Sequence, residues 1–110
     1  MPELKRLWQV LVPCNFNNGK PVRTRHHREW DKRVRKITGG LTILTPGKGQ
    51  WVDPVDNRLY LDRIIPVQVI ATDQEIAQIA AITCQHYRQL ACFYFLVSDQ
   101  VQIFRPKEAA

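Results

Sequence analysis

The strongest candidate for binding chemistry in this sequence is a glycine-rich stretch that carries a lysine. Residues 46–50, Pro-Gly-Lys-Gly-Gln, place Lys48 between Gly47 and Gly49. Glycines let backbone N–H groups approach a phosphate or a carboxylate closely, and the lysine adds positive charge. The spacing is not that of a Walker loop, which is longer and ends in Lys-Ser or Lys-Thr. Two interpretations stay open, an anion-binding loop and a tight turn in which glycine supplies a positive φ.

A basic segment is the second candidate. Residues 20–36 hold eight of the sixteen lysines and arginines but only two acids, so the formal net charge of +6 belongs to this segment. Such a segment binds nucleic acid or another acidic partner, or it is simply a solvated helix surface. No aromatic residue interleaves with the cations on the outer face of the predicted helix to stack on bases, because Trp30 belongs to the apolar stripe. The cations that share the outer face of the predicted helix are Arg25, Arg28, Lys32, Arg35 and Lys36.

The string of residues 25–28, Arg-His-His-Arg, most resembles part of an enzyme. Histidine can serve as an acid, a base or a metal ligand. Neighbouring residues on a helix point about 100° apart, so adjacent histidines rarely hold one metal ion together. We interpret His27 as a partly buried helix residue and His26 as a surface residue. We therefore expect no catalytic residue, no metal site and no cofactor, and an enzyme that uses His26, His27 or Trp51 is the third interpretation.

The composition is that of one globular domain spanning residues 1–110, with 45% hydrophobic and 24% charged residues. Three cysteines without a C-x-x-C pair favour a reducing compartment over a disulfide framework or a zinc site. No stretch reaches the ~18 consecutive apolar residues of a membrane span, and the first residues lack the apolar run of a signal peptide. We expect a cytoplasmic protein that does not enter a membrane.

An alternation of strands and helices must position these candidates. Near-continuous apolar runs predict strands, and apolar residues at every third or fourth position predict helices. The order is β-α-β-β-α-β with a short C-terminal strand, which is typical of the ferredoxin-like plait, an antiparallel four-stranded sheet with two helices on one face. The predicted ranges are strands at 7–12, 41–44, 59–71 and 92–97, helices at 24–37 and after Thr72, and the short strand at 101–104.

Particular residues mark the limits of the two helices. Thr24 is the predicted N-cap of the first helix, and Gly39 follows its C-terminal end. Thr72 and Glu75 form a predicted capping box at the start of the second helix, because they stand three residues apart just before an apolar periodic run. The apolar face of this helix continues to Leu90 by the same periodicity.

The strands carry further predictions. The run at 7–12 is typical of a central strand that is buried on both faces. Residues Leu41–Leu44 are expected to be buried, and 46–49 to form a loop. Pro66 indicates an edge position or a bulge, and it is expected to bend the long strand or to divide it in two.

Two short motifs resemble the PII-like superfamily, the nitrogen-regulatory PII proteins and their diverged relatives. These motifs are Gly-Leu-Thr-Ile at 40–43 and Gly-Lys-Gly-Gln at 47–50. The likeness extends over roughly residues 37–105. The segment before the last strand, residues 86–91, differs from the phosphate loop of PII proteins because it contains no glycine. The dipeptide Gln50-Trp51 is more similar to small plait proteins with a Gly-Leu-Thr-Val…Gly-x-Trp pattern.

The resemblance implies a homotrimer with ligand clefts between its subunits, where PII proteins bind adenine nucleotides. We therefore expect a non-enzymatic regulatory protein that binds a small anion or a nucleotide at such a cleft. Polyanion or nucleic-acid binding by the basic first helix is the alternative, and a small plait enzyme is the third class. The expected ligand-binding residues are Gly47, Lys48, Gly49, Gln50, Trp51, Arg25 and Arg28.

Overall fold

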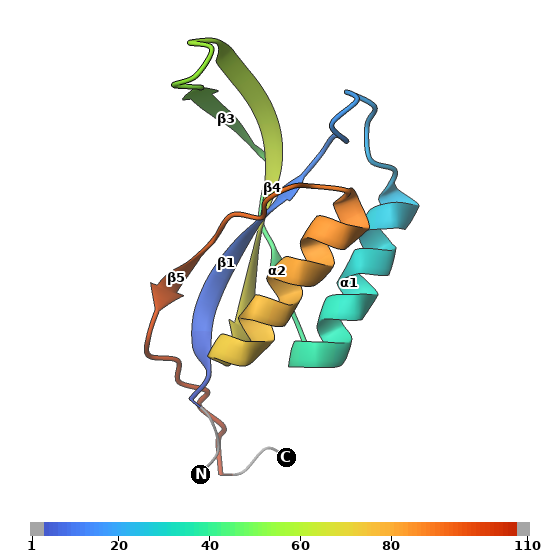
Figure 1. Ribbon diagram of the computed structural model, residues 1–110. Helices are drawn as coiled ribbons and strands as arrows, with labels where there is room; N and C mark the ends of the chain where they lie inside the picture. Colours follow the sequence, from blue (N-terminus) through green and yellow to red (C-terminus); the bar gives the residue numbers. More distant parts are fainter. Residues whose placement is uncertain (1–3, 108–110) are drawn as a thin grey trace.

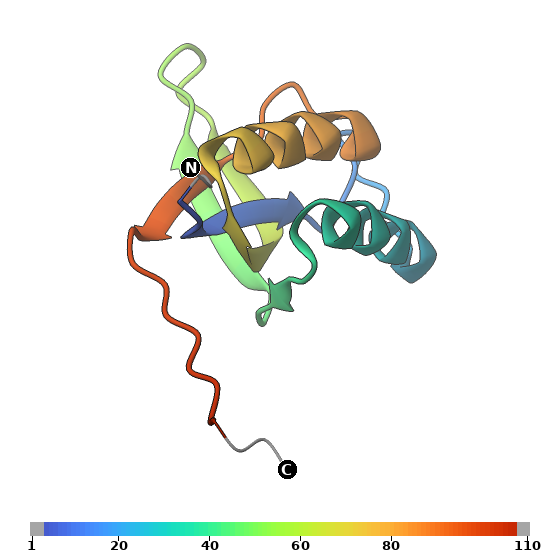
Figure 2. The same cartoon turned by 90° about the horizontal axis from the view of Figure 1, so that it is seen from below.

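Two helices pack on one face of an antiparallel sheet, which Figures 1 and 2 show from two sides. The computed structural model describes residues 4–107. Its elements are β1 (Arg6–Pro13), α1 (Thr24–Thr38), β2 (Thr42–Ile43), β3 (Gly47–Val52), β4 (Leu59–Ala71), α2 (Asp73–Tyr87) and β5 (Tyr94–Ser98). The strand order is β2-β4-β1-β5, β3 also pairs with β4, and every pairing is antiparallel. This arrangement confirms the predicted ferredoxin-like plait.

The core lies between the two helices and the central strands β1 and β4. Trp30 and Val34 of α1 are buried, as are Ile76 and Ile79 of α2, which confirms the predicted helical stripes. Alternate residues of each central strand join them, because successive side chains of a strand point to opposite faces. The buried residues of β1 and β4 are Val10, Val12, Val67, Val69 and Ala71.

The face of β1 that points away from the helices is only partly covered. Leu7, Gln9 and Leu11 keep intermediate exposure, so the prediction that this strand is buried on both faces is wrong. The reason is that both helices lie on the same side of the sheet, and no described residue forms a second layer on the other side (Figure 2).

Local signals at the start of α2 and the end of α1 are confirmed. The Glu75 N–H donates to Thr72 Oγ1 at 3.1 Å, and the Thr72 N–H donates to Glu75 Oε1 at 2.9 Å, which completes the capping box. Gly39 adopts the left-handed conformation with φ 84 and donates its N–H to the carbonyl of Arg35. This conformation favours glycine and ends α1.

Two predicted helix limits are wrong. Arg23, not Thr24, is the N-cap of α1 and makes no side-chain capping bond, since Thr24 is already helical. Leu90 does not continue the buried face of α2 but is fully exposed. The helix ends three residues earlier because Arg88 adopts a left-handed conformation, with φ 55, and turns the chain away.

The segment that follows α1 differs most from its prediction. The strand β2 contains only two residues and both are exposed, so the expectation that Leu41–Leu44 is buried is wrong. Residues 46–49 do not form a loop, because Gly47 begins β3. Gly47 and Gly49 have no positive φ, which excludes the tight-turn interpretation. These residues form the edge of the sheet because β4 extends far beyond the helices. Residues 47–52 pair with residues 59–64 of β4 and so become a strand instead of a loop.

A one-residue bulge separates β2 from β3. Ile43 pairs with Val67 and Gly47 pairs with Ile64, so the edge chain accommodates one extra residue between these pairs. A backbone N–H of the edge chain donates to the Pro66 carbonyl at 2.9 Å. Of the two predicted settings of Pro66, the edge position is wrong, because β4 is paired on both sides and runs unbroken for 13 residues, whereas a bulge is found in the edge chain opposite it. The backbone nitrogen of Pro66, which carries no hydrogen, points toward the bulged edge chain and away from β1. Proline at this position therefore removes no backbone hydrogen bond between β4 and β1.

The β3–β4 hairpin projects beyond the helices (Figure 1) and exposes apolar side chains. The predicted strand at 101–104 does not form, and these residues stay unpaired beyond the edge strand β5. Within residues 4–107, neither helix is long and apolar enough to cross a membrane. The exposed apolar residues of the hairpin strands are Trp51, Val52, Leu59 and Leu61.

Candidate functional site

The predicted glycine-rich site lies on the β3–β4 hairpin. Lys48, Gly49 and Gln50 line a small pocket of about 140 Å³ together with residues 61–63 of β4. Gly47 begins the same strand but does not line the pocket. The site is thus a strand surface rather than a loop.

Two cations face each other in this pocket. Lys48 pairs directly with Arg63 across the antiparallel ladder, so their side chains project from the same face of the hairpin. Gln50 and its partner Leu61 follow on that face. Like charges directly opposite each other destabilise a strand pair, and an anion between them removes this repulsion. Arg63 was not among the predicted residues, because only the strand register places it opposite Lys48.

Trp51 lies on the other face of the hairpin. Its ring stacks on Tyr60, with centroids 4.8 Å apart, and its Nε1 donates to Asp62 Oδ2 at 3.2 Å. These contacts make Trp51 a packing residue of the hairpin within one chain. Half of its surface is still exposed, so the stacked pair offers an apolar plane to a neighbouring molecule.

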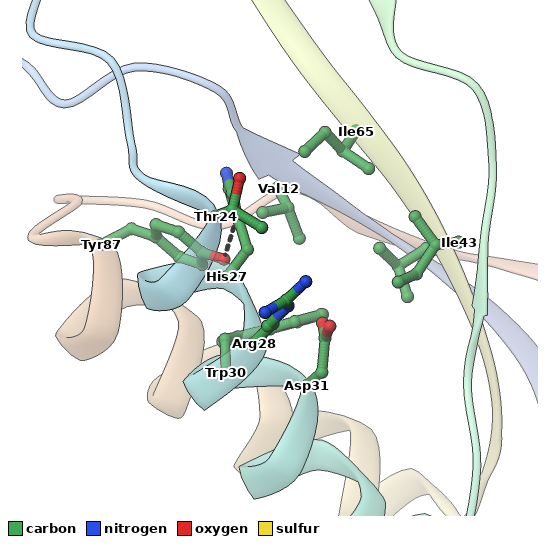
Figure 3. Close-up of a pocket in the computed structure, with 10 residues that line it drawn as sticks. Val12, Thr24, His27, Arg28, Trp30, Asp31, Ile43, Ile65 and Tyr87 are labelled. Atoms are coloured by element: carbon green, nitrogen blue, oxygen red, sulfur yellow. Dashed lines mark hydrogen bonds between the residues drawn. The ribbon is translucent and has the colours of Figure 1, made fainter.

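The two predicted arginines lie on α1, away from the hairpin pocket. Arg28 lines a groove of about 250 Å³ between α1 and the sheet, shown in Figure 3. Arg25 lines neither this groove nor the hairpin pocket, and it forms an ion pair with Glu29 at 3.7 Å. One chain therefore does not bring the predicted lysine and arginines together.

The outer face of α1 is as basic as predicted. Arg25, Lys32, Arg35 and Lys36 are all exposed, and Arg28 is exposed as well but lines the groove between α1 and the sheet. Arg33 instead turns toward α2, where its guanidinium donates to Gln85 Oε1 at 2.9 Å and to His86 Nδ1 at 3.3 Å.

His26 and His86 join α1 to α2. His26 Nε2 donates to the carbonyl of His86 at 2.6 Å, and His86 Nε2 donates to the carbonyl of His26 at 2.7 Å. A carbonyl oxygen only accepts, so both Nε2 atoms carry the proton. His26 is half-buried by this contact, and its interpretation as a surface residue is wrong. Its partner stands 60 residues later, and no local signal in the sequence identified it.

His26, Glu29 and His86 are also the described residues best placed to share a metal ion, with donor atoms within 4.8 Å of one another. The two imidazoles are stacked, with centroids 4.0 Å apart and planes inclined by 28°. A ligating imidazole holds the metal in its own ring plane, and two stacked planes do not meet at one ion. Binding would require ring rotation and loss of both Nε2 hydrogen bonds. The group is better described as a polar contact between the helices.

Burial shifts the pKa values of groups near this contact. It lowers the pKa of His27 and of His86, because desolvation penalises the imidazolium. It raises the pKa of Tyr87, whose hydroxyl contacts His27 Nδ1 at 2.7 Å. Burial also raises the pKa of the Cys92 thiol to about 11. These groups are therefore held in their neutral forms at neutral pH.

No protein-family model matches this sequence, and no curated protein matches it. Several solved structures share the fold. A phage SAM lyase in complex with S-methyl-5′-thioadenosine has a TM-score of 0.66 at 8% identity, over 90% of this chain and 84% of that chain. The divalent cation tolerance protein CutA1 from Thermus thermophilus has a TM-score of 0.62 at 8% identity, over 84% and 82% of the two chains.

The periplasmic divalent cation tolerance protein CutA from Archaeoglobus fulgidus has a TM-score of 0.60 at 10% identity, over 94% of this chain and 88% of that chain. At such low sequence identity these structures show a common fold only, and function has to be argued from the residues of the site. The CutA-like neighbours agree with the PII-like resemblance at the level of fold.

Proposed function

We propose that this protein is a cytoplasmic, homo-oligomeric regulatory protein that binds a small anion or a nucleotide at clefts between its subunits. The observation that supports this best is the cation pair of Lys48 and Arg63 on a projecting hairpin. The one acid that lines the pocket is Asp62, whose carboxylate accepts a hydrogen bond from Trp51 on the other face of the hairpin, and a phosphate would supply a counter-charge between the two cations.

The apolar surface of the hairpin supports assembly. Leu61 is 69% exposed and Leu59 is 58% exposed, although both stand in the longest strand of the sheet. Large exposed apolar side chains that cluster on one element are typical of interaction surfaces. In an oligomer a neighbouring subunit covers them and closes the pocket beside Lys48. Arg25 and Arg28 do not line the hairpin pocket of their own chain, so they can contribute to this anion site only from the neighbouring subunit.

Light scattering during size-exclusion chromatography tests the assembly. We expect a mass of three times the 12.8 kDa of one chain, as the PII-like resemblance implies. Leu61→Arg places a charge on the hairpin and should yield monomers. Leu90→Arg is the matched control, because Leu90 is fully exposed after α2, and it should keep the wild-type mass. A monomeric wild-type protein would exclude the inter-subunit cleft.

Calorimetric titration with ATP and with orthophosphate tests the ligand class. Charge-assisted hydrogen bonds contribute about 1.5–3 kcal/mol, so Lys48→Ala should weaken binding by at least roughly ten-fold. Lys32→Ala is the control, because Lys32 is an exposed lysine that lines neither pocket. Equal affinities of the two variants would remove Lys48 from the site.

A second candidate is polyanion binding by the outer face of α1, which its row of exposed cations favours. Binding of this kind weakens steeply with salt, because each neutralised phosphate releases counterions. Duplex DNA binding should decline with a steep logarithmic salt slope and be lost in the double variant Arg28→Glu and Lys32→Glu. A flat salt response would exclude this candidate.

A further inference from the structure

The groove beside α1 combines an apolar interior with charged groups at its rim. Val12, Trp30 and Ile65 form its interior, and the first two are buried core residues. Arg28 and Asp31 point into the space between α1 and the strands (Figure 3). The volume of about 250 Å³ is slightly below the roughly 300–1,000 Å³ of pockets that hold drug-sized ligands. A fitting ligand is therefore small, with one apolar part.

The two charged groups at the rim have opposite signs and do not neutralise each other. In residues 4–107 the side chains of Arg28 and Asp31 form neither an ion pair nor a hydrogen bond with another residue. Asp31 is partly buried, and burial raises the pKa of its carboxyl, whereas Arg35 and His27 lower it. A cationic group beside Asp31 would remove the cost of keeping this carboxylate ionised.

His27 adds a hydrogen-bond donor at the same rim. The buried hydroxyl of Tyr87 makes its one described hydrogen bond to His27 Nδ1, at 2.7 Å. If His27 donated this bond, the Tyr87 O–H would have no acceptor, and an unsatisfied buried donor is costly. Tyr87 therefore donates, and neutral His27 carries its proton on Nε2. His27 thus keeps an Nε2–H for which residues 4–107 offer no hydrogen-bond acceptor, beside Thr24 and Tyr87, whereas Arg28 supplies the guanidinium donors nearer Asp31 (Figure 3).

We infer that this groove binds a free aliphatic α-amino acid, with its carboxylate on Arg28, its ammonium group on Asp31 and its side chain against Val12, Trp30 and Ile65. A simple anion leaves Asp31 without a partner, and a simple amine leaves Arg28 without one. A zwitterion satisfies both charges, and an aliphatic side chain fills the apolar interior. Within one chain the groove shares no lining residue with the hairpin pocket, so this inference does not require Lys48 or Arg63 to bind an anion.

Nuclear magnetic resonance of the three tryptophan indole N–H groups tests the inference. L-Leucine should shift the signal of Trp30, which lines the groove, and leave that of Trp51 on the hairpin unchanged. Isocaproate, which lacks the ammonium group, and isoamylamine, which lacks the carboxylate, should each bind about ten-fold or more weakly than leucine.

Two variants examine the charged groups separately. Arg28→Gln and Asp31→Asn should each weaken leucine binding by about ten-fold or more, because each removes one charged partner of the zwitterion. Lys32→Gln is the matched control on the outer face of α1 and should bind leucine as the wild type does. The inference is overturned if leucine does not shift the Trp30 signal. It is also overturned if either analogue binds as tightly as leucine, or if both charge variants keep wild-type affinity.

Discussion

Replacing Lys48 with glutamine should stabilise the protein while it weakens anion binding. Lys48 stands directly opposite Arg63, and like charges in this position cost about 0.2–1 kcal/mol. Removing one of them should therefore raise the stability by about 0.5 kcal/mol, which corresponds to a Tm increase of about 2–4 °C. The same substitution removes a charge-assisted bond to the anion, so affinity for phosphate should decrease by at least roughly ten-fold.

Differential scanning calorimetry at two salt concentrations measures this gain. Both cations are exposed, so their repulsion is screened within a Debye length of about 3 Å at 1 M salt, and the Tm difference should nearly vanish there. Lys20→Gln is the control, because Lys20 is an exposed lysine in the loop before α1 that lines neither pocket, and it should leave the Tm unchanged at either salt concentration. A lower Tm for Lys48→Gln, or a gain that salt does not reduce, would refute the reasoning about the cation pair.

Three further predictions concern the helices. Thr72→Ala removes the capping box of α2 and should lower the stability by about 1 kcal/mol, seen as a lower Tm; an unchanged Tm would show that the cap is dispensable. Tyr87→Phe removes the hydroxyl bound to His27 and should also cost about 1 kcal/mol in urea unfolding, whereas wild-type stability would mean that water replaces this bond. Burial lowers the pKa of His27 and His86 in the folded state from the ordinary value of 6.5, so the unfolded chain takes up protons first as the pH falls below about 6.5. The urea midpoint should therefore be lower at pH 5.5 than at pH 7.5, and a constant midpoint would contradict this.

Local sequence signals predicted the helices and the ferredoxin-like order because each depends on residues close together in the chain. The capping box needs Thr72 and Glu75 three positions apart, and the end of α1 needs only Gly39. Leu90 shows the limit of this reasoning. The helical spacing of apolar residues in the sequence extends to Leu90, but the helix has already ended at Arg88, which adopts a left-handed conformation.

The edge of the sheet could not be predicted in the same way. The segment from Pro46 to Gly49 contains a proline and two glycines that are typical of a loop, yet Gly47, Lys48 and Gly49 pair with β4. Pairing along an edge depends on the length and register of the neighbouring strand rather than on the segment's own propensity. For the same reason the partnership of Lys48 with Arg63 became visible only in the structure.

The polar contact between the helices was also beyond sequence reasoning. His26 was an identifiable candidate, but its partner His86 follows at the far end of the second helix. Only the packing of α1 against α2 brings them together. Arg28 was predicted as part of an anion site with Lys48, and within one chain it instead lines a separate groove with Asp31.

A crystal structure of the protein grown with ATP tests the central claim most directly. We predict that each β3–β4 hairpin packs against a neighbouring subunit and that a phosphate group lies between the Lys48 ammonium and the Arg63 guanidinium. A hairpin that faces solvent, or a nucleotide bound away from both cations, would contradict it.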